Sequence, residues 1–317
     1  MKKILCTLAL ILTFLLVLTS CNLPFLKGEE TGATTPEETT AEVPEQAFPT
    51  SKGLAYRVNE DGKTCTVSGI GTCTDTEIFI GGYIDGYEVT AIGNLALYNQ
   101  QRIKSVIIGD SITAIGNYAF RKCQNLTSVV IGDSVVTIGD FAFEYCRNLD
   151  SVVIGNSVTT IGNSAFERCE SLESVTLGAS VTTIGDDAFG NCENLMRITL
   201  PDSVITIGDR AFYGCIYLMN VTLGNSVATI GSDAFKECHS ITSVIIPNSV
   251  THIGTEAFAW GIMLANVTFA TPDGWYYSSK ENATSGTKLS ATDLSDPKTA
   301  AQYLRAEYAA YYWYRTE

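Results

Sequence analysis

The stretch LTSVVIGDSVVTIGDFAFEYCRN, residues 126–148, is one copy of a unit that fills most of this 317-residue chain. Its Ile-Gly pair returns at a fixed interval of 23 residues, with the isoleucine at Ile92, Ile115, Ile138, Ile161, Ile184, Ile207, Ile230 and Ile253. A fixed period of about 20 to 50 residues is typical of stacked supersecondary units. The array therefore predicts a solenoid in which neighbouring units share one core.

Each unit begins with a short alternating segment. In Leu126–Ile131 the residues Leu126, Val129 and Ile131 point inward and Ser128 and Val130 outward, because strand side chains alternate between faces. A turn of Gly or Pro, then Asp or Asn, then Ser follows, since these residues suit tight turns. The acidic members of this turn column are better explained by turn chemistry than by calcium binding.

The residue after each Ile-Gly pair has a side chain that can accept hydrogen bonds at a helix start: Asn94, Asn117, Asp140, Asn163, Asp186, Asp209, Ser232 and Thr255. We interpret this column as helix N-caps. The Ala-Phe and Cys that follow would then point inward from a short helix. One unit is therefore expected to contain strand, turn, short strand and capped helix.

The unit closely resembles the BspA-like leucine-rich repeat of bacterial surface antigens. The matching positions in one repeat are Leu172, Val175, Leu177, Ser180, Val181, Ile184, Gly185, Ala188, Phe189 and Cys192. Departures are concentrated at the ends, where Gln100 and Gly261 replace Cys and Leu97 replaces Phe, and Gly often stands where Pro is usual. The resemblance implies an α/β repeat solenoid, a right-handed coil of 23-residue units with short parallel strands and short capped helices.

The ends of the array depart from the repeat. Residues 52–88 are expected to form an N-terminal hairpin cap and an irregular first turn, 89–269 the solenoid, and 270–317 a C-terminal helical cap. A helix from Pro297 to Arg315 is predicted to cover the last repeat with its tyrosines. Trp275, Trp313 and Tyr314 remain candidates for exposed stacking.

The N-terminus carries an export pattern. Residues 1–20 contain Lys2 and Lys3 and a short apolar run, which favours a signal peptide over a membrane helix. The sequence Leu18-Thr19-Ser20-Cys21 resembles a bacterial lipobox, which implies cleavage before Cys21 and a lipid on its sulfur; an ordinary signal peptide is the alternative. Residues 21–51 are rich in Thr, Glu and Pro and are expected to be a disordered tether. The chain is thus expected at the bacterial cell surface, on the cell membrane, or on the outer membrane if the cell has one.

Charge and composition exclude several function classes. A formal net charge of −14 without a basic run opposes nucleic-acid binding. No catalytic constellation, cofactor loop or metal-binding spacing is present, so we expect neither an enzyme nor a cofactor. The repeated cysteines are expected to be buried reduced thiols, kept apart by helix diameters of about 8 to 10 Å; Cys65 and Cys73 are the one pair considered for a disulfide.

A partner would meet the outward strand positions of the predicted concave face. The candidate binding residues are Ser128, Val130, Ser151, Val153, Ser174, Thr176, Arg197, Thr199, Asn220, Thr222, Ser243 and Ile245. These residues also simply favour strands. A second apolar set, Leu95, Tyr118 and Phe141, is expected either to be covered by the N-terminal cap or to bind a partner.

The functional prediction is a noncatalytic surface lipoprotein that binds a protein ligand, in adhesion to host or neighbouring cells. The alternatives are a self-associating envelope scaffold and an accessory carbohydrate-capture protein.

Overall fold

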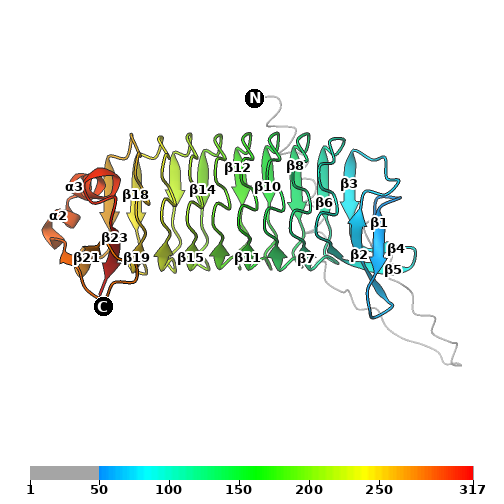
Figure 1. Ribbon diagram of the computed structural model, residues 1–317, viewed down its shortest axis with the longest axis horizontal. Helices are drawn as coiled ribbons and strands as arrows, with labels where there is room; N and C mark the ends of the chain where they lie inside the picture. Colours follow the sequence, from blue (N-terminus) through cyan, green and yellow to red (C-terminus); the bar gives the residue numbers. More distant parts are fainter. Residues whose placement is uncertain (1–49, 317) are drawn as a thin grey trace, which may run out of the picture. The chain divides into compact units, whose positions relative to one another are not determined.

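The computed structural model describes residues 50–316, which belong to one compact unit (Figure 1). The predicted signal peptide, the lipid site at Cys21 and nearly all of the predicted tether lie outside the described residues. Among the described helices, none has the length and apolar content needed to cross a membrane.

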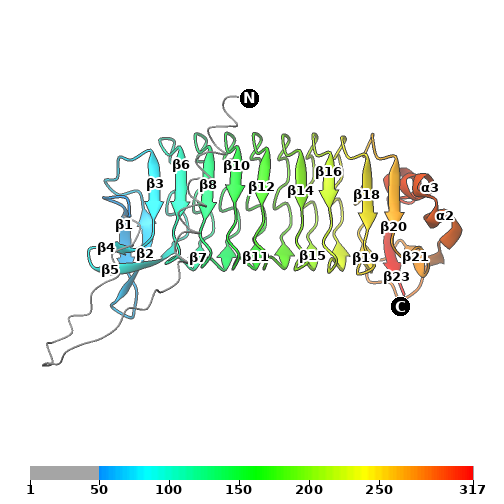
Figure 2. The same cartoon turned by 180° about the vertical axis from the view of Figure 1, so that it is seen from behind.

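Long parallel strands form one side of the solenoid, one from each repeat (Figures 1 and 2). Their in-register pairing places equivalent residues of successive repeats side by side, so that Ser128 pairs with Ser151 and Ser151 with Ser174. The strands are β3 (Glu77–Ile80), β6 (Ser105–Ile108), β8 (Ser128–Ile131), β10 (Ser151–Val153), β12 (Ser174–Thr176), β14 (Arg197–Thr199), β16 (Asn220–Thr222), β18 (Ser243–Ile246) and β20 (Asn266–Phe269).

A second side is built from the strands that end in the Ile-Gly signature. Each isoleucine points into the core and is at most 2% exposed, while the residue before it faces outward. These strands form one continuous ladder. They are β5 (Tyr87–Ile92), β7 (Ala114–Ile115), β9 (Thr137–Ile138), β11 (Thr160–Ile161), β13 (Thr183–Ile184), β15 (Thr206–Ile207), β17 (Thr229–Ile230) and β19 (His252–Ile253).

The third side contains turns, and the predicted repeat helices are wrong. Successive backbone N–H groups alternate between two directions instead of bonding four residues back. Those of Tyr118, Phe120 and Lys122 donate to the next repeat, at 2.7 to 2.9 Å. Those of Ala119, Arg121 and Cys123 donate three residues back, at 3.2 to 3.3 Å. Half of the backbone N–H groups that would donate within an α-helix therefore donate to the next repeat instead.

Positive φ angles at two positions of each repeat also exclude a helix there. The first position holds Leu95, Tyr118, Phe141, Ser164, Asp187, Arg210, Asp233 and Glu256, and the second, four residues later, holds Asn99, Lys122, Tyr145, Arg168, Asn191, Gly214, Glu237 and Trp260. Both occupy the third residue of a four-residue turn, where a type II turn requires positive φ. Neither position ever holds Val, Ile or Thr, the residues that resist this conformation most.

The column interpreted as helix N-caps is instead a ladder between repeats. The Oδ1 atom of Asn94 accepts a hydrogen bond from the backbone N–H of Asn117 at 2.8 Å, and Asn117 accepts from Asp140 at 2.9 Å. The same bond continues through Asp140, Asn163, Asp186 and Asp209 to the N–H of Ser232. The ladder also explains the glycine of the signature, because a Cβ atom on Gly116 would lie 2.7 Å from Asn94 Oδ1. Asparagine and aspartate are suited both to capping a helix and to accepting this hydrogen bond between repeats, so the sequence pattern does not distinguish the two roles.

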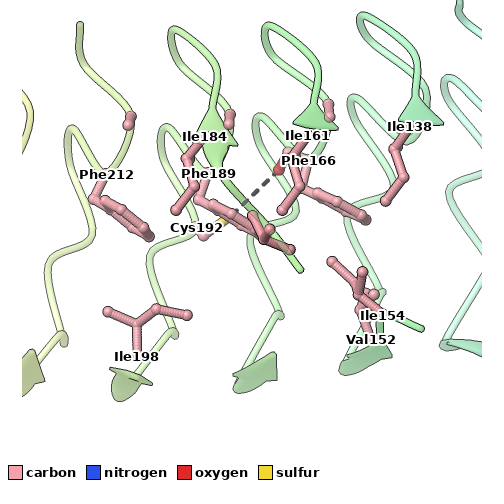
Figure 3. Packing of buried hydrophobic residues seen from close by; sticks show 14 of the residues in the cluster. Ile138, Val152, Ile154, Ile161, Phe166, Ile184, Phe189, Cys192, Ile198 and Phe212 are labelled. Carbon is pink, nitrogen blue, oxygen red and sulfur yellow. Dashed lines mark hydrogen bonds between the residues drawn. The ribbon is translucent and has the colours of Figure 1, made fainter. Parts of the chain in front are cut away.

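The core between the three sides is a set of side-chain columns. The phenylalanines from Phe120 to Phe258 stack nearly parallel, with ring centroids 4.9 to 5.4 Å apart. This spacing is the rise of one repeat. Figure 3 shows three of them, Phe166, Phe189 and Phe212. Each phenylalanine is at most 1% exposed, and burial of such a side chain stabilises the fold by about 2 to 3 kcal/mol.

The repeat cysteines are buried free thiols, as predicted, but the predicted reason is wrong because no helices separate them. Each thiol donates to a carbonyl of the preceding repeat; Cys192 Sγ lies 3.2 Å from Phe166 O (Figure 3). Burial raises the pKa of Cys146 and Cys169 well above its usual value. Each thiol donates to the equivalent carbonyl of its own neighbouring repeat, and none is covalently bonded to another sulfur. Cys65 and Cys73 are also free and buried.

The N-terminal end is covered by an antiparallel hairpin of β1 (Ala55–Val58) and β2 (Thr64–Gly69), which joins the short-strand ladder through β5. The two-residue strand β4 (Tyr83–Ile84) pairs with β5 in the irregular first turn. At the edge of β3, Ser51 donates its N–H to Phe79 O at 2.8 Å. Part of this sheet edge is therefore occupied by the chain itself.

The C-terminal cap mixes helices and strands, unlike the single helix predicted from Pro297 to Arg315. The helices α2 (Ala291–Ser295) and α3 (Pro297–Gln302) lie against β20, and one π turn ends at Glu307. The strand β23 (Tyr312–Arg315) then runs antiparallel to β19 and pairs with β21 (Trp275–Ser278), which pairs with β22 (Thr287–Lys288). A strand is favoured here because it continues the ladder that a solenoid end would leave unpaired.

The three aromatic residues predicted as exposed stacking candidates are buried in this cap, which corrects that prediction. Trp275 is 0% exposed, Trp313 1% and Tyr314 8%. Trp313 stacks on Phe269 with a centroid distance of 6.1 Å, and its indole N–H donates to Tyr308 O at 3.1 Å. These side chains therefore close the core instead of presenting a binding surface.

Replacing Asn163 by alanine is predicted to lower the free energy of unfolding by about 1 to 2 kcal/mol, because the N–H of Asp186 loses its acceptor. Replacement by aspartate keeps the acceptor and should change stability much less. Urea unfolding of residues 46–317 measures both. The matched control is Asn148→Ala at an exposed loop position; equal losses for N163A and N148A would contradict the ladder's role.

Candidate binding surface

The structure places all the candidate strand residues on the outer surface of the long-strand side. In β8 and β10 they are half-buried, because each lies between neighbours on both sides. From β12 to β18 they are exposed, and Ile245 is 64% exposed. The C-terminal half of this face is therefore the more accessible part.

The long-strand side is interrupted twice. It consists of a five-stranded sheet from β3 to β12, a pair β14–β16 and a pair β18–β20. At each interruption a strand followed by glycine meets a strand followed by proline: Gly178 precedes Pro201 by one repeat, and Gly224 precedes Pro247. Where a long strand is followed by glycine or alanine, it remains hydrogen-bonded to the long strand of the preceding repeat.

Proline explains the interruptions in two ways. A residue with an N–H can donate a ladder bond at this position, as Gly132 does to Ile108 O and Ala270 to Ile246 O, at 2.8 and 2.9 Å, and proline has no N–H to donate. Glycines also let successive turns approach closely, because a Cβ on Gly178 would overlap the carbonyl oxygen of Gly155. A proline ring in that position requires a wider separation. Each of the two interruptions, which we call seams, coincides with one proline, Pro201 at the first and Pro247 at the second.

A groove of about 770 Å³ lies at the second seam, between β16 and β18. Val221 and Leu223 line it and are only partly buried, whereas Val244 and Ile246, their equivalents one repeat later, are at most 2% exposed. The exposed Ile245 forms part of the opposite wall. The seam therefore exposes apolar surface that an intact ladder would cover.

The apolar set Leu95, Tyr118 and Phe141 lies on the turn side and is not covered by the N-terminal cap. Leu95 is 55% exposed, and the rings of Tyr118 and Phe141 stack with centroids 4.9 Å apart. The guanidinium of Arg121 lies 5.5 Å from the centre of the Tyr118 ring and forms an ion pair with the buried Glu144. This set therefore presents accessible apolar side chains, with the positively charged guanidinium group held beside two of them.

The structure reveals one surface that the sequence reasoning missed. Six exposed large apolar residues lie on the loops that precede the long strands in the C-terminal half: Met196, Tyr217, Met219, Trp260, Ile262 and Met263. The available signal was the change from charged to apolar residues at the same repeat positions, for example from Arg147 and Glu170 to Ile216 and Ile262.

The acidic turn column participates in backbone pairing. Asp133 Oδ1 accepts from Asn156 N at 2.7 Å, and Asp202 Oδ1 accepts from Asn225 N at 2.8 Å. Within residues 50–316 no cluster of three or more His, Cys, Asp or Glu side chains is arranged to hold a metal ion.

The sequence pattern described as "BspA type Leucine rich repeat region" matches residues 90–204 and 182–303, in six copies. The chain belongs to the BspA-type leucine-rich repeat family. No curated protein matches it significantly.

Among solved structures, a leucine-rich repeat protein of T. pallidum is 28% identical, with a TM-score of 0.56; the match covers 61% of this chain and 90% of that one. A leucine-rich cell surface protein of Faecalibacterium prausnitzii is 26% identical, with a TM-score of 0.48. That match covers 76% of this chain and 58% of the other protein.

Replacing Pro247 by glycine is predicted to close the second seam, because the new N–H can donate to Leu223 O and the smaller residue permits close approach. Hydrogen exchange of the peptides that contain β16 and β18 should slow by roughly fivefold, equivalent to about 1 kcal/mol. Pro272→Gly, outside the ladder, is the control. Unchanged exchange in P247G would show that proline does not cause the seam.

Proposed function

We propose that this protein is a noncatalytic bacterial surface lipoprotein that binds a protein ligand through the outward face of its long strands. The observation that carries the proposal is the exposed stretch from β12 to β18, where hydroxyl and β-branched side chains border the apolar groove at the second seam. Such a face offers hydrogen bonds and apolar contact over several repeats at once.

The chemistry of this face favours an extended polypeptide over a charged ligand. Arg197 is the one ionisable group among the proposed binding residues, and no aromatic ring stands among them to stack on a sugar. Apolar contact comes from Ile245 and from the partly buried Val221 and Leu223 in the groove. A peptide can place one apolar side chain in the groove and bond to the neighbouring threonines and serines.

Surface location is supported by the match to the BspA-type repeat family and by the N-terminal sequence. The N-terminal sequence Leu18-Thr19-Ser20-Cys21 has the form of a lipobox. We therefore extend the proposal to adhesion, with a lipid on Cys21 holding the protein on the membrane.

The double substitution Arg197→Glu plus Thr222→Lys is predicted to weaken ligand binding at least tenfold, because both residues lie on the exposed part of the proposed face. The measurement is surface plasmon resonance of residues 46–317 on immobilised collagen, fibronectin and laminin. Thr137→Lys plus Thr160→Glu, on the short-strand side, is the matched control. Saturable binding that survives the first pair would exclude the long-strand face.

Replacing Cys21 by serine is predicted to abolish incorporation of labelled palmitate and to release the protein from the membrane fraction. A lipid-bearing sulfur cannot form on serine, and stable anchoring requires the acyl chains. The measurement is metabolic labelling of the full chain expressed in a bacterium, followed by fractionation. Cys6→Ser, within the signal sequence, is the control; labelling of C21S would contradict the lipobox interpretation.

A further inference from the structure

Half of the exposed large hydrophobic side chains in the described part of the chain lie on one surface, which we call the loop ridge: Met196, Tyr217, Met219, Trp260, Ile262 and Met263. Their exposed fractions range from 38% to 69%. The same positions in earlier repeats hold Arg147, Asp150 and Glu173. Large apolar side chains exposed in three of four neighbouring loops, on a chain of net charge −14, point to contact with another molecule.

The loop ridge consists of four successive rows, residues 193–196, 216–219, 239–242 and 262–265. The rows are hydrogen-bonded to one another. Met219 N donates to Met196 O at 2.9 Å, Ser240 Oγ to Ile216 O at 2.8 Å, and Met263 N to His239 O at 3.2 Å. With a rise of about 5 Å per repeat, the ridge extends roughly 15 Å along the solenoid.

The second, third and fourth rows alternate between bulky and small exposed side chains. The second row carries Tyr217 and Met219, whereas the third row carries only the partly buried His239 and Ser240 and the short Thr242. The fourth row is bulky again, with Ile262 and Met263 and the adjacent Trp260. A raised row thus lies next to a low one, and this profile complements itself when one copy is reversed.

Opposite charges lie at the two ends of the ridge. Glu193 is exposed in the first row, and in the described part of the chain its carboxylate makes no ion pair or hydrogen bond. Arg305 lies beside the fourth row, where its Nη1 atom is 3.4 Å from Ile262 O. Reversal of one copy would bring the carboxylate of each chain to the guanidinium of the other.

We propose that the loop ridge pairs two copies of this chain with their solenoid axes antiparallel. The two-fold axis lies in the interface, between the second and third rows. Tyr217 and Met219 of each copy then cover the low third row of the other. The fourth row packs on Met196 of the other copy, and Glu193 meets Arg305 twice. The ridge shares no residue with the groove or with the proposed ligand face, which it adjoins where Met196 and Met219 directly precede Arg197 and Asn220.

Sedimentation velocity of residues 46–317, the compact unit that contains the whole described core, tests the pairing. The expected result is a monomer–dimer equilibrium across the micromolar range. Met219→Lys should weaken dimerisation at least tenfold, whereas Ile205→Lys, also an exposed apolar residue but on the short-strand side, should leave it unchanged. A wild-type chain that stays monomeric throughout, including one that binds matrix proteins as a monomer, overturns the proposal.

A charge exchange tests the antiparallel arrangement and controls for misfolding. Glu193→Lys alone should weaken the dimer, because the introduced ammonium group would face the guanidinium of Arg305 in the other copy. Adding Arg305→Glu should restore dimerisation to within about threefold of wild type. Failure of the double variant to restore it, with unchanged thermal unfolding, overturns the proposed pairing even if dimers form by another surface.

Discussion

Hydrogen bonding between successive repeats, continuous along the short-strand side and interrupted twice on the long-strand side, is the constraint on which this structure depends. Parallel strands bond on two sides, and the turn side contributes both alternate backbone N–H groups and the oxygens of the Asn163 column. Together these bonds fix a rise of about 5 Å. At that rise the phenylalanines stack, the isoleucines form a continuous core, and any atom added between turns must displace the chain. The glycine of the Ile-Gly signature follows from this limit.

Much of the fold could be predicted from the sequence because period and alternation report directly on burial. The 23-residue interval identified the stacked unit, and the alternation around Val129 placed inward and outward residues correctly. The repeat helices could not be excluded in this way. An asparagine such as Asn163 is suited both to capping a helix and to accepting a hydrogen bond from the next repeat. The positive φ at Tyr118 and Phe141 cannot be predicted from their residue types, because the only feature of that column is that it lacks β-branched side chains. Tyr312 was assigned to a helix for a similar reason: its spacing fits one, and only the unpaired edge of β19 makes a strand preferable.

The surface was less predictable than the core, because accessibility depends on relations between repeats. The candidate residues do face outward, yet the sequence pattern treats all repeats alike. The candidate residues are more exposed from β12 onward, where the long-strand ladder is interrupted at Pro201 and at Pro247, neither of which has an N–H to donate. The loop ridge was also visible only once Met196, Tyr217 and Met263 were seen to occupy adjacent rows. Substitutions that looked like ordinary variation between repeats therefore create the features that distinguish one part of this surface from another.

The buried thiols have a consequence for how the chain reaches its native state. From Cys123 to Cys238 each sulfur is shielded from solvent, free, and bonded to a carbonyl of the preceding repeat. Folding of the repeat array thus needs no disulfide-forming catalyst, and a reductant finds no disulfide to break in the part of the chain from Thr50 to Thr316. The stability of this core rests on packing and hydrogen bonds alone, so the same covalent structure serves in a reducing compartment and outside it.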